Sequence, residues 1–303
     1  MEEIILMTGY RCNLRCPYCP LEKDGPTMAD AAALRALDLF LDDRGRKKVR
    51  FFGGETLLNF ELVRRCVRHA GKGPRYEINT NSYLLDRDKL GFLKKYDFEL
   101  IISFDFLNKK NLAVFKLLKE EKVLDKATFT LVAAPETVDD LEKNFSALIG
   151  RGAKKIHILP VFYTKIWPAG KIKRLEEAVL KIAAGYRAGR YFLEGVVDLE
   201  DELRKRRASP RKNLFIDTDG SIFYDDLVLL LPRRERGRFK AGDIGRIGNF
   251  SEISGEKKLE LEGFFPTKAM LNKERIKSAV REANQIIEKK NAGQNNQSGQ
   301  KMQ

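Results

Sequence analysis

Three of the four cysteines in this 303-residue chain lie close together near its start. They are Cys12, Cys16 and Cys19, spaced as C-x3-C-x2-C after the apolar run Ile4–Met7. Thiolate ligands select iron–sulfur clusters, zinc or copper. Iron–sulfur clusters ordinarily have four cysteine ligands, so a four-iron cluster with three leaves one iron open for a further ligand. Because the loop is short, we expect its three sulfurs to point inward together, as a four-iron cluster would require.

Zinc is the alternative that these residues leave open. A structural zinc ion takes four protein ligands, so the fourth would come from Cys66, His69 or His157, all far along the chain. Such a protein would be a non-catalytic zinc-binding or interaction module. The apolar neighbours of Cys66 favour a small buried hydrophobic side chain, and His69 is expected on a solvated helix face. For His157, a satisfied core histidine is favoured over a substrate contact.

Three further polar segments follow strand-like runs of the chain. They are Gly53-Gly54-Glu55, Asn79-Thr80-Asn81-Ser82 and Ser103-Phe104-Asp105. Together with the cysteine loop, and with Tyr18 just before its last cysteine, they resemble the ordered motifs of the radical S-adenosylmethionine (radical SAM) enzymes. The resemblance covers about residues 1–165 well and the remainder loosely.

The resemblance implies two cofactors: one [4Fe-4S] cluster on the three cysteines, and S-adenosylmethionine (SAM) at its open iron. It also implies a set of SAM-binding residues, which are Tyr18, Gly53, Gly54, Glu55, Asn81, Ser103 and Asp105. An enzyme of this kind reductively cleaves SAM to methionine and a 5′-deoxyadenosyl radical, which abstracts hydrogen from a substrate.

Each of these residues has an expected task. The two glycines let the backbone approach the cofactor closely. Tyr18 is expected beside the adenine, Glu55 near the ammonium group and Asn81 near the methionyl or ribose portion. Ser103 and Asp105 alternate along a strand, so both face one side of it, where the resemblance implies ribose binding. No residue is assigned a proton-transfer role, so the catalytic residues stay unknown.

The alternation of strand-like and helix-like segments predicts an α/β fold with a parallel sheet. The expected strands are 4–8, 48–52, 77–80, 99–103, 128–132 and 155–159, and the expected helices are 28–43, 57–70, 86–96, 109–122, 137–150 and 172–189. The resemblance implies a partial (β/α)6 TIM-like barrel with a small α+β C-terminal extension. In such barrels the chemistry gathers at the C-terminal ends of the strands, where all the motifs lie.

The second half of the chain predicts a domain division. We expect a radical SAM barrel over 1–200, an extension over 201–255, a helical segment over 256–290 and a disordered tail over 291–303. Asp219-Gly220 between two short strand-like runs predicts a hairpin, which resembles the SPASM and twitch extensions of radical SAM enzymes. Those extensions bind auxiliary clusters through cysteines. Here no cysteine follows Cys66, so the extension is expected to lack them.

The formal net charge of +14, with basic runs at 204–207 and 233–236, favours acidic partners. A peptide or protein side chain is the expected substrate, and RNA or a nucleotide is the alternative. A solvated basic face is the simplest interpretation of such runs.

An external electron donor such as a flavodoxin or ferredoxin is implied by the resemblance. No apolar stretch is long enough to span a bilayer and no signal peptide is recognised, so we expect a cytoplasmic protein without membrane partners.

Overall fold

The computed structural model describes residues 2–42, 47–104, 112–161, 167–186, 192–196, 213–224, 226–253 and 273–300. The chain divides into two compact units. The first unit joins Met1–Ile101 with Asp201–Phe264, and the second joins Ile102–Glu200 with Phe265–Gln303. The cysteine loop and the predicted hairpin therefore belong to the same unit.

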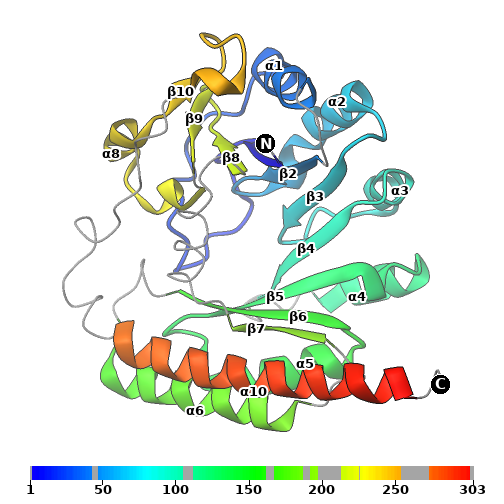
Figure 1. Ribbon diagram of the computed structural model, residues 1–303, viewed down its shortest axis with the longest axis vertical. Coiled ribbons are helices and arrows are strands. Elements are labelled where there is room, and N and C mark those ends of the chain that lie inside the picture. Colours follow the sequence, from blue (N-terminus) through cyan, green and yellow to red (C-terminus); the bar gives the residue numbers. More distant parts are fainter. Residues whose placement is uncertain are drawn as a thin grey trace. The chain divides into compact units, whose positions relative to one another are not determined.

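The first unit is built on a mixed sheet. Its strands are β1 (Glu3–Met7), β2 (Lys48–Phe52), β3 (Arg75–Thr80), β8 (Asn213–Ile216), β9 (Ser221–Phe223) and β10 (Gly242–Asp243). Their order is β10-β9-β8-β1-β2-β3, with β1 parallel to both β2 and β8, and with β9 antiparallel to its two neighbours (Figure 1). All five residues of β1 are buried, which is why this central parallel strand is almost wholly apolar.

Helices and short turns complete this unit. They are α1 (Asp30–Leu41), α2 (Phe60–Ala70), α3 (Arg87–Lys95) and α8 (Arg233–Arg236), with the 3-10 turns η1 (Thr56–Asn59), η5 (Asp226–Leu230), η6 (Gly237–Phe239) and η7 (Phe250–Glu252). The core behind the sheet contains Phe51, Tyr76 and Phe98, whose rings stack with centroids 5.1–6.4 Å apart. These aromatic contacts hold β2, β3 and the end of the α3 segment together.

The other face of this sheet has a group of paired charges near the start of the strands. The Glu77 carboxylate on β3 forms ion pairs with Lys48 at 2.5 Å and with Arg50 at 2.6 Å, both on β2. Arg50 also lies 3.1 Å from Glu3 on β1. The burial of these charges requires such pairing, because an isolated ion in this position would be strongly destabilising.

The second unit contains a parallel β5-β6-β7 sheet and its helices. The elements are α4 (Ala113–Glu120), η3 (Leu124–Lys126), β5 (Ala127–Ala133), η4 (Val138–Asp140), α5 (Leu141–Gly150), β6 (Lys155–Pro160), α6 (Ala169–Gly185), β7 (Phe192–Val196) and α10 (Lys273–Gln300). The remaining strand, β4 (Glu99–Phe104), runs across the division between the units. Figure 1 shows α6 and α10 side by side.

The predicted α/β fold with a parallel sheet is confirmed, and every expected strand and helix is present within a few residues of its expected bounds. The predicted hairpin is also found, as β8 and β9. Its parallel pairing with β1 was not predicted. The described helices include none that is both long and apolar enough to cross a membrane.

The end of the chain differs from the expectation of a disordered tail over 291–303. Helix α10 continues to Gln300, so residues 291–300 are helical. One physical reason lies at Lys290 and Asn291, where α10 is fixed to the end of α6. The Lys290 ammonium donates to the carbonyls of Ala183, Ala184 and Tyr186, and the Tyr186 hydroxyl donates to Asn291 at 2.6 Å.

Candidate functional site

The cysteine loop follows β1 and presents three half-buried thiols, on Cys12, Cys16 and Cys19. The Cys19 amide donates to the Cys16 carbonyl at 3.1 Å, which makes a turn between these two cysteines. The Cys12 sulfur accepts the Leu14 amide at 3.4 Å. Among the described residues, no group of three or more Cys, His, Asp or Glu side chains is gathered closely enough to hold a metal ion. That the three sulfurs converge on one cluster stays a prediction.

The start of the loop is held by the end of β2. Beyond the regular strands, the Thr8 amide donates to the Phe52 carbonyl at 2.8 Å. The Gly54 amide then donates to Gly9 and the Glu55 amide to Arg11, both at 2.9 Å. The Gly-Gly-Glu segment therefore continues the β1–β2 pairing to the residue just before Cys12.

The two glycines are needed for this close approach. A Cβ on Gly54 would lie 2.3 Å from the Tyr10 carbonyl oxygen and 2.5 Å from that of Arg11. A Cβ on Gly53 would lie 2.7 Å from the Gly9 carbonyl oxygen. The sequence predicts close approach to a cofactor at these positions, and the structure shows close approach to the backbone that leads into the cysteine loop.

The Glu55 carboxylate is buried, with 1% of the residue exposed, and it is occupied by protein donors. Its Oε1 accepts the Leu57 amide at 3.0 Å and the Thr80 hydroxyl at 2.7 Å, and its Oε2 accepts the Asn81 amide at 2.7 Å. Burial raises the pKa of Glu55, and the three donors oppose that rise. These three bonds join the end of β2 to the end of β3, and the expected contact of Glu55 to the SAM ammonium stays a prediction.

Asn81 is brought beside the cysteine loop. Its amide nitrogen donates to the Asn13 side chain at 2.8 Å and lies 3.8 Å from the Cys12 sulfur. The next residue, Ser82, has a φ of 64°, a left-handed conformation that favours glycine.

The other predicted SAM contacts are placed less completely. Tyr18 is half-buried within the cysteine loop, and Ser103 is exposed near the end of β4. Asp105 lies outside the described residues. Ser103 belongs to the second unit, whereas the cysteine loop belongs to the first.

The side chains weighed as a fourth metal ligand lie in different settings. Cys66 is fully buried in α2, and burial raises the pKa of its thiol to about 12. It therefore matches the expected small buried hydrophobic residue. His69 lies at the surface with its Nε2 2.6 Å from Asp38, which agrees with a solvated helix face. His157 is half-buried on β6, so it is not in the fully buried core.

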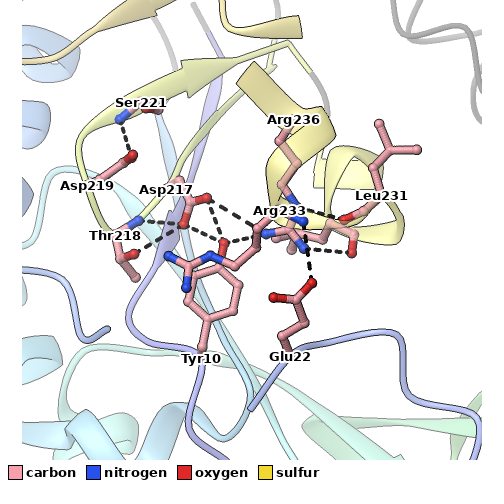
Figure 2. A network of polar contacts seen from close by, with 10 residues as sticks. Tyr10, Glu22, Asp217, Thr218, Asp219, Ser221, Leu231, Arg233 and Arg236 are labelled. Atoms are coloured by element: carbon pink, nitrogen blue, oxygen red, sulfur yellow. Dashed lines mark hydrogen bonds and ion pairs between the residues drawn. The ribbon is translucent and has the colours of Figure 1, made fainter. Parts of the chain in front are cut away.

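Sequence reasoning missed a buried polar network beside the loop (Figure 2). The Tyr10 hydroxyl lies 2.7 Å and 2.6 Å from the two carboxylate oxygens of Asp217, to which it donates, and it accepts from Arg236 at 2.6 Å. Burial, followed by the Asp217 charge, raises the pKa of Tyr10. Arg236 belongs to the basic run 233–236, for which a solvated face was the simplest interpretation. Only 3% of Arg236 is exposed, so this residue is buried. No local pattern joins residues 207 positions apart in the sequence.

The residues present fit the expected cofactors by their chemistry. Three thiols lie on one accessible loop, and the Asn81 amide already contacts the sulfur of Cys12. Burial raises the pKa of the Cys12 thiol, so metal binding there would have to displace its proton. Cys12, Cys16 and Cys19 are the residues that would hold an iron–sulfur cluster.

Comparison with curated proteins gives partial matches. An uncharacterised protein of Methanocaldococcus jannaschii is 34% identical over 113 residues, which is 35% of this chain and 40% of that protein. The radical SAM cyclopropyl synthase TigE of Paramaledivibacter caminithermalis is 25% identical over 37% of this chain and 28% of its own. The GTP 3′,8-cyclase of Aliarcobacter butzleri is 37% identical over 33% of each chain. The chain thus spans between 28% and 40% of the length of these relatives.

Solved structures share the fold over more of the chain. A structure of anSMEcpe with bound AdoMet has a TM-score of 0.68 and 17% identity, covering 88% of this chain and 83% of its own. Streptococcus suis SuiB bound to S-adenosylmethionine has a TM-score of 0.55 and 19% identity, covering 75% and 60%. At these identities the likeness concerns the fold, and it confirms the radical SAM type of α/β architecture.

The family match covers the part of the chain that contains the cysteine loop and the strand-end motifs. The sequence model described as the Radical SAM superfamily matches residues 6–148. Members of this superfamily use a [4Fe-4S] cluster and SAM. The matched range contains the three clustered cysteines, Gly53 to Glu55 and Asn81. The structure brings these residues to one end of the first unit. Residues 6–148 of the chain therefore form a radical SAM domain.

Proposed function

We propose that this protein is a radical SAM enzyme that abstracts hydrogen from a peptide or protein side chain. The observation that supports it best is the set of three accessible thiols on a loop held by the Gly-Gly-Glu segment and by Asn81. When bound at Cys12, Cys16 and Cys19, the cluster supplies the electron that cleaves SAM reductively to methionine and a 5′-deoxyadenosyl radical. Residues of the chain bind, orient and shield these groups.

Several residues have distinct tasks in this proposal. Glu55 is a positioning residue, because its oxygens bind the Leu57, Thr80 and Asn81 donors and so hold the end of β3 against the end of β2. The Asn81 side chain, fixed through its amide oxygen by the Tyr83 backbone at 3.1 Å, presents its nitrogen to the loop. The whole predicted set, Tyr18, Gly53, Gly54, Glu55, Asn81, Ser103 and Asp105, stays a set of proposed SAM contacts.

A peptide substrate is supported by the comparisons. TigE is named a radical SAM cyclopropyl synthase, and SuiB and anSMEcpe have structures with bound peptides, a precursor peptide in the case of SuiB. The chain has no cysteine after Cys66, so residues 201–255 offer no thiolates for a second cluster. The proposed reaction therefore uses a single cluster and an external electron donor of the flavodoxin or ferredoxin type.

A nucleotide or RNA substrate is the second candidate. The GTP 3′,8-cyclase of Aliarcobacter butzleri is 37% identical over 111 residues. The formal net charge of +14 would also attract polyanions. Exposed Arg234 and Arg238 contribute to this charge in the described part of the chain.

Anaerobic reconstitution tests the activity. The purified chain is loaded with iron and sulfide, reduced with dithionite and incubated with SAM. We expect about four irons per chain and formation of 5′-deoxyadenosine. Cys12→Ala, Cys16→Ala and Cys19→Ala should each abolish both, whereas Cys66→Ala, in the buried core of α2, is the matched control that retains them. One tightly bound zinc per chain with no cleavage of SAM would overturn the proposal.

A second experiment separates the substrate classes. Formation of 5′-deoxyadenosine is measured with GTP, with transfer RNA and with a library of synthetic peptides, each at low and high salt. Peptide-dependent stimulation, with a mass change on the peptide, supports the first candidate. Stimulation by GTP, or binding of RNA that weakens steeply with salt, supports the second.

A further inference from the structure

We propose that the C-terminal extension positions the cysteine loop through a polar clamp formed by Tyr10, Asp217 and Arg236. The inference rests on the proposed function, because the loop matters as the site of the cluster. It assigns to residues 213–240 a task that needs no cysteine in the extension. Every residue of the clamp lies in the first unit.

The extension is fixed to the sheet before it reaches the loop. Strand β8 pairs with β1 in parallel, and Leu6 lies opposite Ile216. Asp217 follows directly, so it is placed at the same end of the sheet as the cysteine loop. Its backbone amide donates to the Ser221 carbonyl at 2.9 Å, and its Oδ1 accepts the Thr218 amide at 2.6 Å. The carboxylate is therefore held rigidly by the hairpin.

Arg236 supplies the opposite charge from α8. Its Nε donates to the Leu231 carbonyl at 2.9 Å and its Nη2 to the Leu229 carbonyl at 3.2 Å. Its Nη1 donates to the Tyr10 hydroxyl at 2.6 Å and lies 4.0 Å from Asp217. A buried guanidinium is tolerated only with such partners. The three side chains therefore depend on one another, because removing one would leave a buried partner without its hydrogen bond or ion pair.

Tyr10 connects this unit to both ends of the cysteine loop. It lies two residues before Cys12, and its backbone amide donates to the Pro26 carbonyl at 3.2 Å. Gly25 packs on its ring so closely that a Cβ there would lie 2.6 Å from a ring atom. Arg233 covers the ring at 4.8 Å from its centroid. The entrance and the exit of the loop are thus anchored at one buried residue.

A second contact joins the extension to the segment that follows the last cysteine of the loop. The Arg233 amide donates to the Glu22 carboxylate at 3.4 Å, as Figure 2 shows beside the clamp. Residues 11–25 are therefore held at both ends while the thiols stay half-buried and reachable. A loop with fixed ends presents its three sulfurs with less conformational freedom to lose when a cluster binds. Outer partners of this kind position metal ligands without touching the metal.

The test uses the full chain with three clamp variants and two matched controls. Tyr10→Phe removes only the hydroxyl, and Asp217→Asn removes the negative charge. Asp219→Asn is the control in the same hairpin, since Asp219 is exposed. Arg234→Lys is the control for Arg236→Lys, since the Arg234 side chain is 85% exposed.

The clamp predicts four changes that the controls do not show. In the apo protein, the loop thiols of Tyr10→Phe and Asp217→Asn react faster with a thiol reagent. In the reconstituted protein, KM for SAM rises and the reduced cluster's electron paramagnetic resonance signal responds less to SAM. The rate of 5′-deoxyadenosine formation at low SAM falls about tenfold or more. Because the two residues share one contact, their double variant should lose less than the product of the single losses.

The outcomes are separable from those of the proposed function. Clamp variants with the thiol reactivity, KM and spectroscopic response of the wild type would overturn the clamp, even if the wild type cleaves SAM. A wild type that binds no cluster would overturn the proposed function, while the apo thiol rates would still decide whether the clamp holds the loop. If Asp217→Asn does not fold, the nearly isosteric Tyr10→Phe decides alone.

Discussion

The Oε2 atom of Glu55 accepts a 2.7 Å hydrogen bond from the backbone amide of Asn81, and this bond ties the end of β2 to the end of β3. Asn81 in turn donates to Asn13 in the cysteine loop. Two motifs that lie 26 residues apart in the sequence thus act as one support for that loop. The carboxylate of the Gly-Gly-Glu segment serves the architecture of the site.

Replacing Glu55 should destabilise the first unit. Glu55→Ala leaves the Leu57 and Asn81 amides and the Thr80 hydroxyl without their acceptor. Each buried donor left unpaired costs about 1–3 kcal/mol, so the loss should exceed that of Glu55→Gln, which keeps one oxygen. Urea unfolding of the apo protein measures the difference. Glu61→Ala, at an exposed position of α2, is the control and should change stability by less than about 0.5 kcal/mol. Equal stability of Glu55→Ala and wild type would contradict the role assigned to this carboxylate.

The stability of the protein should also depend on pH through Glu55, and the direction of the Glu55 pKa shift determines the sign. Burial raises the folded-state pKa of Glu55 above its ordinary value of 4.5. A raised pKa means that this group's contribution to stability is fully present below 4.5 and is lost as pH rises through the folded-state value. Wild type should therefore lose stability relative to Glu55→Gln as pH rises from 4.5 toward neutral. Unfolding curves at several pH values check this, and the opposite slope would show that the three donors outweigh burial.

Adding one methyl group to Gly54 should disturb the cysteine loop. The new Cβ would lie 2.3 Å from the Tyr10 carbonyl oxygen, which is a backbone atom and cannot rotate away. Gly54→Ala should therefore displace residues 10 and 11 and reduce iron content and SAM cleavage by about tenfold or more. Gly73→Ala is the matched control, since a Cβ there meets nothing within 4 Å. Iron analysis and 5′-deoxyadenosine formation are the measurements, and a Gly54→Ala protein with wild-type values of both would refute this reading.

The four thiols should separate into two classes. Cys66 is fully buried with a pKa raised to about 12, whereas Cys12, Cys16 and Cys19 are half-exposed. A thiol reagent at pH 8 should modify three cysteines of the native apo protein and the fourth only after unfolding, because the thiolate is the reactive form. Mass spectrometry of the labelled protein counts them. Rapid labelling of Cys66 in the native state would contradict its buried position.

Lys290 should stabilise the second unit by capping α6. Its ammonium lies 2.6 Å from the Ala184 carbonyl and 3.1 Å from that of Tyr186, at the helix end where carbonyls lack partners. Lys290→Met keeps most of the aliphatic stem and should cost about 1 kcal/mol. Lys289→Met, at an exposed position of the same helix, should cost little. Thermal unfolding compares the two variants. Equal melting temperatures for both would contradict a capping role for Lys290.

The sequence by itself determined the features that depend on near neighbours. Strand and helix positions follow from hydrophobic periodicity, and the β8–β9 hairpin follows from Asp219-Gly220 between two short strand-like runs. The spacing of Cys12, Cys16 and Cys19 and the order of the strand-end motifs predicted the family and the end of the sheet where the site lies. The site contacts assigned by resemblance at Tyr18, Ser103 and Asp105 stay predictions.

Only the tertiary structure decided which distant residues meet. The pairing of β8 with β1, and the contact of Tyr10 with Asp217 across 207 positions, depend on which sheet edge was free, and no local propensity records that. For the same reason, the structure assigned the Glu55 carboxylate to protein donors and gave Arg236 a buried place in an apparently solvated basic run. A side chain's chemistry can be read from its type, but the partners that satisfy it are set by packing between segments remote in sequence.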